Sequence, residues 1–461
     1  MRNRIHKILL GYAALLMLVS ACKPELEAPD VNANGLDFTH YVAVGNSITA
    51  GYADGALYYE GQQNSLAKLI AQQFQLAQSF DFRQPLIPQG SIGIGASLNA
   101  KYALYNAADC KGVYSLTPKP VAGIGDYLLF NFTDPTKLIY STQGPFNNMG
   151  VPGVKSTTTL VHGYGNYTLG TGNYNPFYSR MASAPLTSSI LDDAMAQTPS
   201  FFTLFLGNND VLLYALSGGK KDAITPSAGS AGFGFDNSMQ AIVTTLTSGG
   251  AEGVIATVPS ITSIPHFTTI PWNGLVLDQP TIDFIVQKYL NAGVPAGSIP
   301  PFHVGVNAFV MADASQTYGF RQMVAGEYVL LSTPGDSIKC KGWGSAKALP
   351  DSCVLNATEV LAINNAVTAY NITIRNLATT HNLPLVDVNA FLQQAETGIT
   401  YNGVTVNTKF ASGGAFSLDG VHLTPLGNAA LANEFLKAIN AHYGSTIPLI
   451  NVTKYHGVQF P

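Results

Sequence analysis

Four short stretches of the chain carry residue types that together could transfer an acyl group. Ser47 stands in a Gly-Asn-Ser turn after a short apolar run, where its hydroxyl could act as a nucleophile. His422 could accept the hydroxyl proton, and Asp419, three residues earlier, could orient the imidazole through Nδ1. Gly153 and Asn209 could donate hydrogen bonds to an oxyanion beside the Ser47 amide. The residue types therefore predict nucleophilic acyl transfer.

Each of these candidates lies at the end of a predicted strand or in a tight turn. Continuous apolar runs bounded by turn residues are typical of buried parallel strands, and apolar residues spaced three and four apart indicate helices that pack on them. A strand, a helix begun by Asp236 and a second strand follow one another closely, which predicts a right-handed βαβ unit. Strands are expected at 41–45, 201–206, 254–258 and 383–387, and helices at 64–74, 236–248, 358–380 and from 425, with a Gly-rich turn at 147–153.

The four stretches resemble the sequence blocks of the SGNH (GDSL-like) hydrolase family. The family blocks are Gly-Asp-Ser-Leu, a Gly-containing turn, Gly-x-Asn-Asp and Asp-x-x-His, and the four blocks here occur in the same order. They read Gly45-Asn46-Ser47-Ile48, Gly150-Val151-Pro152-Gly153, Gly207-Asn208-Asn209-Asp210 and Asp419-Gly420-Val421-His422.

The resemblance implies an α/β fold, a three-layer α/β/α sandwich with a flavodoxin-like parallel sheet. It also implies Ser47, His422 and Asp419 as a catalytic triad, with Ser47, Gly153 and Asn209 as oxyanion donors. The chain departs from the family at Asn46, where an Asp is usual, and in the second block, where the end of the turn favours Gly153 over Gly150. Two long insertions, at about 79–145 and 259–355, enlarge the expected core.

The N-terminal segment predicts export. Basic residues precede an apolar run that is too short to span a bilayer comfortably, and the run ends in Val-Ser-Ala-Cys22, which resembles a bacterial lipobox. We expect a lipoprotein signal peptide at 1–21, a lipidated Cys22 at the start of a tether over 22–36, and a catalytic domain over 37–461. Acyl chains on Cys22 would anchor the protein to a membrane of the bacterial envelope, either the outer membrane or the cell surface.

Composition and motifs indicate which ligands to expect, and the cysteines indicate which disulfides are possible. The net charge is −4 and only 11% of the residues are charged, so no basic face for nucleic acid is expected. No metal-binding motif occurs and no cofactor is expected. Cys110, Cys340 and Cys353 allow three single disulfide pairings, and one of them, between Cys340 and Cys353, would close a short loop.

Other sites compete for the same roles. One competing stretch, Gly335-Asp336-Ser337-Ile338, matches the family's Gly-Asp-Ser-Leu block more closely than the stretch around Ser47 does. However, it follows the second and third blocks, and no helical pattern comes after it. The Asp37-x-x-His40 spacing repeats that of the fourth block, but it precedes the first strand, at the end opposite Ser47. Asp210 could contact a substrate or the base, although an Asp after Asn is more often a helix cap.

The predicted function is ester hydrolysis by a serine nucleophile. The ester could belong to a lipid or to an O-acylated glycan, and the sequence does not decide between them. The alternative is a non-catalytic surface lipoprotein that uses the same fold to bind a glycan or a protein partner. Reaction of Ser47 with a fluorophosphonate separates the two hypotheses, because a binding protein would not react.

Overall fold

The computed structural model describes residues 30–95, 100–122, 144–170 and 172–461. The predicted signal peptide, Cys22 and the strand-like run 127–130 lie outside these residues. Within them, no helix is both long and apolar enough to cross a bilayer.

A five-stranded parallel sheet forms the centre of the molecule. Its order is β15-β8-β7-β1-β6, which in chain order is 2-1-3-4-5 read from β6. This is a common order for doubly wound sheets, and the direction of winding reverses between β1 and β7. The strands are β1 (Tyr41–Gly45), β6 (Asn148–Gly150), β7 (Phe201–Phe205), β8 (Glu252–Ala256) and β15 (Leu385–Val386).

Strand β6 corrects the prediction of a turn at 147–153. Ala43 pairs with Asn148 and Gly45 with Gly150 in parallel register along β1. The Asn148 side chain is buried and donates to the Thr49 carbonyl at 2.9 Å. The strand has only three residues, and one of them, Asn148, is polar. Its composition is therefore typical of a turn, although its backbone forms an edge strand of the sheet.

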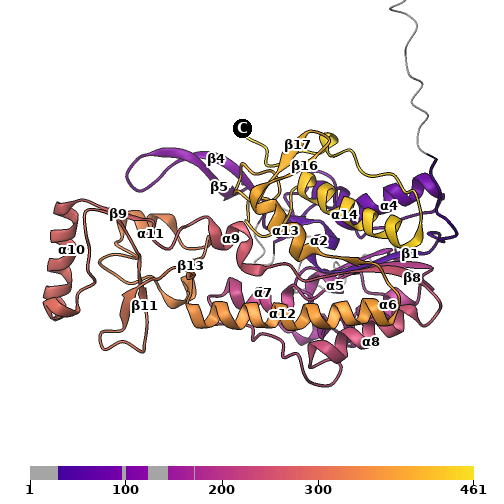
Figure 1. The fold of residues 1–461 in the computed structure, drawn as a ribbon, viewed down its shortest axis with the longest axis horizontal. Helices are drawn as coiled ribbons and strands as arrows, with labels where there is room; N and C mark the ends of the chain where they lie inside the picture. The colour runs from indigo at the N-terminus through magenta and orange to yellow at the C-terminus, as the bar shows by residue number, and fades with distance from the viewer. Residues whose placement is uncertain (1–29, 96–99, 123–143, 171) are drawn as a thin grey trace, which may run out of the picture.

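Helices cover both faces of this sheet (Figure 1). On one face lie α4 (Leu66–Ala77) and α14 (Pro425–Tyr443), and on the other lie α8 (Phe235–Thr247) and α12 (Ala357–Thr380). Both faces of β1 and β7 are consequently buried, which explains their continuous apolar sequences.

The ends of these helices follow the capping signals only in part. Thr424 caps α14 and Pro425 occupies its first position, as predicted. Helix α8 begins one residue before its predicted cap, so Asp236 lies in the first turn and its carboxylate accepts a hydrogen bond from Thr373 on α12. Asp236 therefore joins two helices instead of capping one.

Residues 259–355, which were predicted to be the second insertion, form a lobe beside the sheet, at the left of Figure 1. Its outer part has two small apolar clusters of its own, one around Phe309 and one around Ile285, whereas Ile261, Phe267 and Leu330 belong to the main core. Its elements are η6 (Ile261–Ser263), α9 (Pro265–Thr268), β9 (Leu275–Leu277), α10 (Gln279–Asn291), η7 (Ala296–Ser298), β10 (Gly305–Asn307), β11 (Val310–Ala312), β12 (Phe320–Gln322), β13 (Tyr328–Val329), α11 (Gly335–Cys340), η8 (Asp351–Cys353) and β14 (Val354–Leu355).

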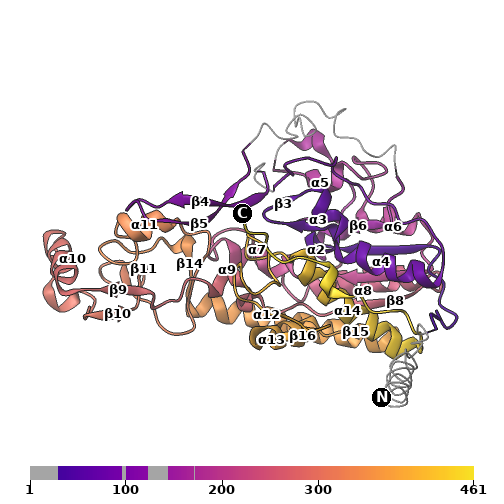
Figure 2. The same ribbon diagram turned by 90° about the horizontal axis from the view of Figure 1, so that it is seen from above.

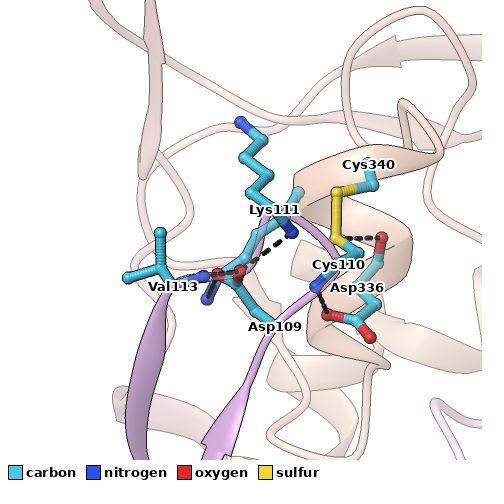
Figure 3. The surroundings of a disulfide bond; sticks show 7 residues. Asp109, Cys110, Lys111, Val113, Asp336 and Cys340 are labelled. Carbon is cyan, nitrogen blue, oxygen red and sulfur yellow. Dashed lines mark hydrogen bonds and ion pairs between the residues drawn. A yellow bond between two sulfur atoms is a disulfide. The ribbon is translucent and has the colours of Figure 1, made fainter.

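The first insertion contributes a hairpin that reaches this lobe. Strands β4 (Tyr102–Ala108) and β5 (Tyr114–Pro120) run from the sheet domain toward α11 (Figure 2). At the hairpin turn a disulfide joins Cys110 to Cys340 of α11, and the Cys110 amide donates to Asp336 (Figure 3). Of the three pairings that the sequence allowed, this is the one present, and Cys353 is a free thiol.

Shorter elements complete the described chain. They are α2 (Ser47–Ala50), β2 (Tyr52–Ala53), β3 (Ala56–Leu57), α3 (Tyr59–Gln63), η4 (Thr158–Leu160), η5 (Tyr167–Leu169), α5 (Pro176–Ser179), α6 (Ile190–Met195), α7 (Asn209–Leu216), α13 (Val388–Thr397), β16 (Ile399–Tyr401), β17 (Val404–Val406) and η9 (Val452–Lys454). Residues 30–36, the described part of the predicted tether, are held against the domain, because Asn32 and Thr446 bond each other and Asn34 donates to the Tyr443 carbonyl.

Candidate active site

The turn after β1 presents Ser47 at the carboxyl end of the sheet. Gly45 ends the strand, and any Cβ there would collide with Thr49 and with the backbone of Phe205 on β7. The Asn46 side chain then caps α2 by accepting a hydrogen bond from the Ile48 amide at 2.9 Å. Asn46 thus makes the local bond expected of the Asp that it replaces, and Ser47 becomes the first residue of a short helix.

His422 lies beside Ser47 although the two residues are 375 positions apart. The imidazole Nε2 is 2.9 Å from the Ser47 Oγ, and Nδ1 is 2.8 Å from Asp419 Oδ2. A carboxylate can only accept, so Nδ1 carries the proton and Nε2 is free to accept the one on the serine hydroxyl. The three side chains therefore form one continuous chain of hydrogen bonds.

Asp419 is held as a charged and fully bonded carboxylate. Oδ2 also accepts the Gly55 amide at 2.8 Å, while Oδ1 accepts the amides of Val421 and His422 at 2.9 and 2.8 Å. Burial alone would raise the pKa of Asp419, but the imidazole and these donors lower it well below the ordinary value. Its negative charge can stabilise an imidazolium on His422.

A turn near Ser47 fastens the loop that carries Asp419. In the tight turn between β2 and β3, Asp54 accepts the Leu418 amide at 2.9 Å and the Tyr58 hydroxyl at 2.7 Å. The Asp54 amide donates to Ser417 Oγ at 2.9 Å. Burial raises the pKa of Asp54. Asp54 was not predicted from the sequence, because its Asp-Gly pair signals a hairpin turn but does not indicate which distant loop the turn contacts.

Three hydrogen-bond donors face the same cavity as the Ser47 hydroxyl. Among the described residues, none accepts a hydrogen bond from the backbone amides of Ser47 and Gly153. Gly153 has φ +80°, a conformation that favours glycine. Asn209 begins α7, and its Nδ2 donates to the Val154 carbonyl at 2.9 Å, which orients the amide and leaves its second proton free. This set can bind an oxyanion.

Asp210 does not contact the triad. It is fully buried, and its two oxygens accept the Ser156 amide and hydroxyl at 2.8 and 2.7 Å. Burial raises the pKa of Asp210. Asp210 therefore links the start of α7 to the loop that follows Gly153. This link helps to hold the Gly153 and Asn209 donors in position.

The competing candidates lie elsewhere. Ser337 is buried within α11, where a helix exists although the sequence pattern predicted none. His40 precedes β1, and its Nδ1 lies 3.0 Å from the Gln197 carbonyl, at the opposite end of the strand from Ser47. His266, which was not a sequence candidate, is buried in the wall of a cavity that Ser47 and His422 also line, and burial lowers its pKa.

Two cavities meet at the triad. The large cavity, of about 740 Å³, opens between the sheet domain, the β4–β5 hairpin and the lobe. Its wall includes Tyr102 and Thr117 of the hairpin and Leu331 and Ser332 of the lobe. The small pocket, of about 60 Å³, has an almost entirely apolar wall. Both insertions thus take part in the site.

Within the part of the chain that the structure describes, no three His, Cys, Asp or Glu side chains gather as a metal site would require. Searches of protein-family models, curated proteins and solved structures found no significant match to this chain.

Proposed function

We propose that this protein is a serine ester hydrolase of the SGNH type. The observation that carries the proposal is the hydrogen-bonded chain from Ser47 through His422 to Asp419, with distances of 2.9 and 2.8 Å. The 2-1-3-4-5 strand order, which is also that of flavodoxin-like sheets, adds support because ligands bind at the reversal point of such sheets. Ser47 follows β1 and Asn209 follows β7, the two strands on either side of that point.

The reaction would proceed in two steps. His422 Nε2 takes the proton from Ser47 as Oγ attacks the ester carbonyl, and the amides of Ser47, Gly153 and Asn209 stabilise the tetrahedral oxyanion. The C–O bond then breaks, and His422 returns the proton to the departing alcohol. Water, deprotonated by His422, hydrolyses the acyl-enzyme and releases the acid. Asp419 keeps the imidazole oriented throughout.

Covalent labelling tests the proposal. A fluorophosphonate should modify the wild-type protein at Ser47, and Ser47→Ala should abolish both labelling and hydrolysis of p-nitrophenyl esters. Because triad members act as a unit, the loss should reach several orders of magnitude, and His422→Ala should cause a similar loss. A folded wild-type protein that neither reacts nor hydrolyses would instead support the alternative, a binding lipoprotein.

Export and anchoring belong to the same proposal. Signal-peptide cleavage before Cys22 and acylation of its sulfur would place the domain on the envelope, and the Cys110–Cys340 disulfide supports an oxidising compartment. Incorporation of labelled palmitate into the full chain, and its loss in Cys22→Ser, tests this part.

A further inference from the structure

The two cavities at the triad share the reacting groups but differ in size and in most of their walls. Ser47, Asn209 and His422 line both of them, and so do Leu212 and Val421. An ester carbonyl bound at Ser47 would therefore have one substituent directed toward each cavity. Since an ester has an acyl side and an alcohol side, the two cavities can divide the substrate between them.

The small pocket fits an acyl chain and excludes a polar group. Beyond the shared residues, most of its wall is apolar. The apolar side chains come from α2, β7, η6, α13, α14 and the loops between them, among them Ile48, Phe205, Ile261, Val388, Leu392 and Leu431. Asn46 and Asn208 also border it, but the amide atoms that lack partners, Nδ2 and Oδ1 respectively, are covered. A hydroxyl placed there would lose its hydrogen bonds to water and find no replacement.

The size of the small pocket limits the chain length. Its volume of about 60 Å³ is less than a tenth of that of the large cavity, so it has room only for a short chain. The main core closes its far end, because Phe205 and Leu431 in its wall are each 1% exposed. A longer chain would have to displace close-packed side chains.

The large cavity suits a bulky alcohol. Its volume is more than ten times that of the small pocket. Its wall contains both polar side chains, including His266 and Ser332, and apolar ones. His422, which must return a proton to the alcohol oxygen, forms part of its wall. The leaving group can therefore occupy this cavity and diffuse away from it while the acyl group remains on Ser47.

We propose that the small pocket is the acyl subsite, so that the protein hydrolyses esters of short acyl groups with bulky alcohols. This inference rests on the proposed function and specifies its substrate. It predicts that each methylene buried in the pocket raises kcat/KM about fourfold until the pocket is full. Beyond that length the rate should fall steeply.

A chain-length series tests the proposal. We expect the wild-type kcat/KM to be highest for p-nitrophenyl butanoate and at least tenfold lower for the octanoate and dodecanoate. Leu392 is one of four residues, with Phe391, Phe416 and Leu423, that line both the small pocket and a neighbouring apolar cavity of about 20 Å³. Leu392→Ala should therefore join the two and raise the octanoate-to-butanoate ratio. Val388→Phe should fill the pocket and leave acetate as the best substrate.

A matched change in the other cavity is the control. Leu216 lines only the large cavity, so Leu216→Trp should lower the rates for all acyl lengths by the same factor. A wild-type preference for dodecanoate, or a chain-length profile that neither pocket variant changes, would overturn the acyl assignment. If either variant misfolds, the wild-type chain-length series alone still tests whether the small pocket binds the acyl group. Absence of fluorophosphonate labelling would instead refute the proposed function, and the assignment with it.

Discussion

At the scale of single residues, the site depends on carboxylates that hold other groups in position. Asp419 accepts its bonds from the loop 417–422 and from Gly55, while Asp54 holds Leu418 from the turn after β2. The position of the imidazole is therefore fixed by a contact between an early and a late segment of the chain. Small displacements of a catalytic group are costly, since about 1 Å can lower turnover about 100-fold.

Asp54→Ala should lower kcat on p-nitrophenyl butanoate by roughly 10- to 100-fold with little change in KM, because Leu418 loses its acceptor and the Asp419 loop shifts. Asp54→Asn keeps an acceptor for that amide and should recover most of the loss. Kinetics of both variants, with melting temperatures, measure the effect. A kcat for the Ala variant equal to that of the wild type would show that Asp54 does not position the loop.

Asn209→Ala should lower kcat by about 10²–10³-fold, as expected for removal of one oxyanion donor. The KM should change much less, because the bond strengthens only when the carbonyl oxygen becomes charged. Steady-state kinetics provide the measurement. Asn209 also bonds the Val154 carbonyl, so a thermal melt must accompany it, and a loss confined to KM would exclude the oxyanion role.

At the scale of elements, the sequence predicted the parts that a continuous apolar run defines. Strands β1, β7 and β8 and helices α12 and α14 were predicted within a few residues, because burial on both faces or on one helical stripe leaves a regular pattern. Strand β6 was missed because it is short and contains Asn148. The β4–β5 hairpin was missed because most of its side chains are exposed and leave no apolar pattern.

The candidate site was predictable to the same extent. Its four blocks gave the triad and the donors, and the structure brings these residues together. Three features could not be read from the chain. The contact of Asp54 with Leu418 depends on tertiary packing, and the disulfide depends on which of three thiols meet. The small pocket is assembled from elements between residues 46 and 431. None of them is a local property of the sequence.

Asp109 and Lys339 form an ion pair with an N–O distance of 2.9 Å. This ion pair predicts that the stability of the β4–β5 hairpin depends on pH. The bond to Lys339 and the amides of Val113 and Lys111 lower the pKa of Asp109 from 3.8 to about 2. Because the folded pKa is the lower one, the stabilisation is present above pH 3.8 and disappears as the pH falls toward 2. Asp109→Asn should therefore lower the melting temperature at neutral pH, and the difference should vanish between pH 4 and 2.

Melting temperatures of wild type and variant across this range provide the test. Asp81→Asn is the matched control, since Asp81 forms an exposed ion pair with Arg83 and lies away from the hairpin. A difference in melting temperature between Asp109→Asn and wild type that is independent of pH would show that the carboxylate charge does not fasten the hairpin to α11.

At the scale of the whole molecule, the apolar interior is divided. The main core surrounds the sheet, and the lobe has its own small clusters around Phe309 and Ile285. Small clusters bury little area and open at a lower free energy than the main core. The outer part of the lobe, around Phe309 and Ile285, can therefore loosen while Ser47 and its sheet remain folded. His266 and Leu331 in the wall of the large cavity are next to Phe267 and Leu330, which belong to the main core.

Phe309→Ala should destabilise the lobe by about 3–5 kcal/mol, as expected for a buried Phe. Hydrogen exchange followed by mass spectrometry should show faster exchange across 305–329 and unchanged protection in β1 and β7. Phe435→Ala on α14, in the main core, is the comparison and should raise exchange throughout the sheet. Equal exchange of lobe and sheet in the Phe309 variant would mean that they unfold as one unit.

The bond between Ser47 and His422 spans 375 residues, and this separation has a consequence during translation. The serine leaves the ribosome long before the histidine has been polymerised. Throughout that interval the hydroxyl has no proton acceptor and is no more reactive than any other alcohol. If the proposed function holds, a nascent chain cannot attack ester bonds around it until its synthesis has passed residue 422.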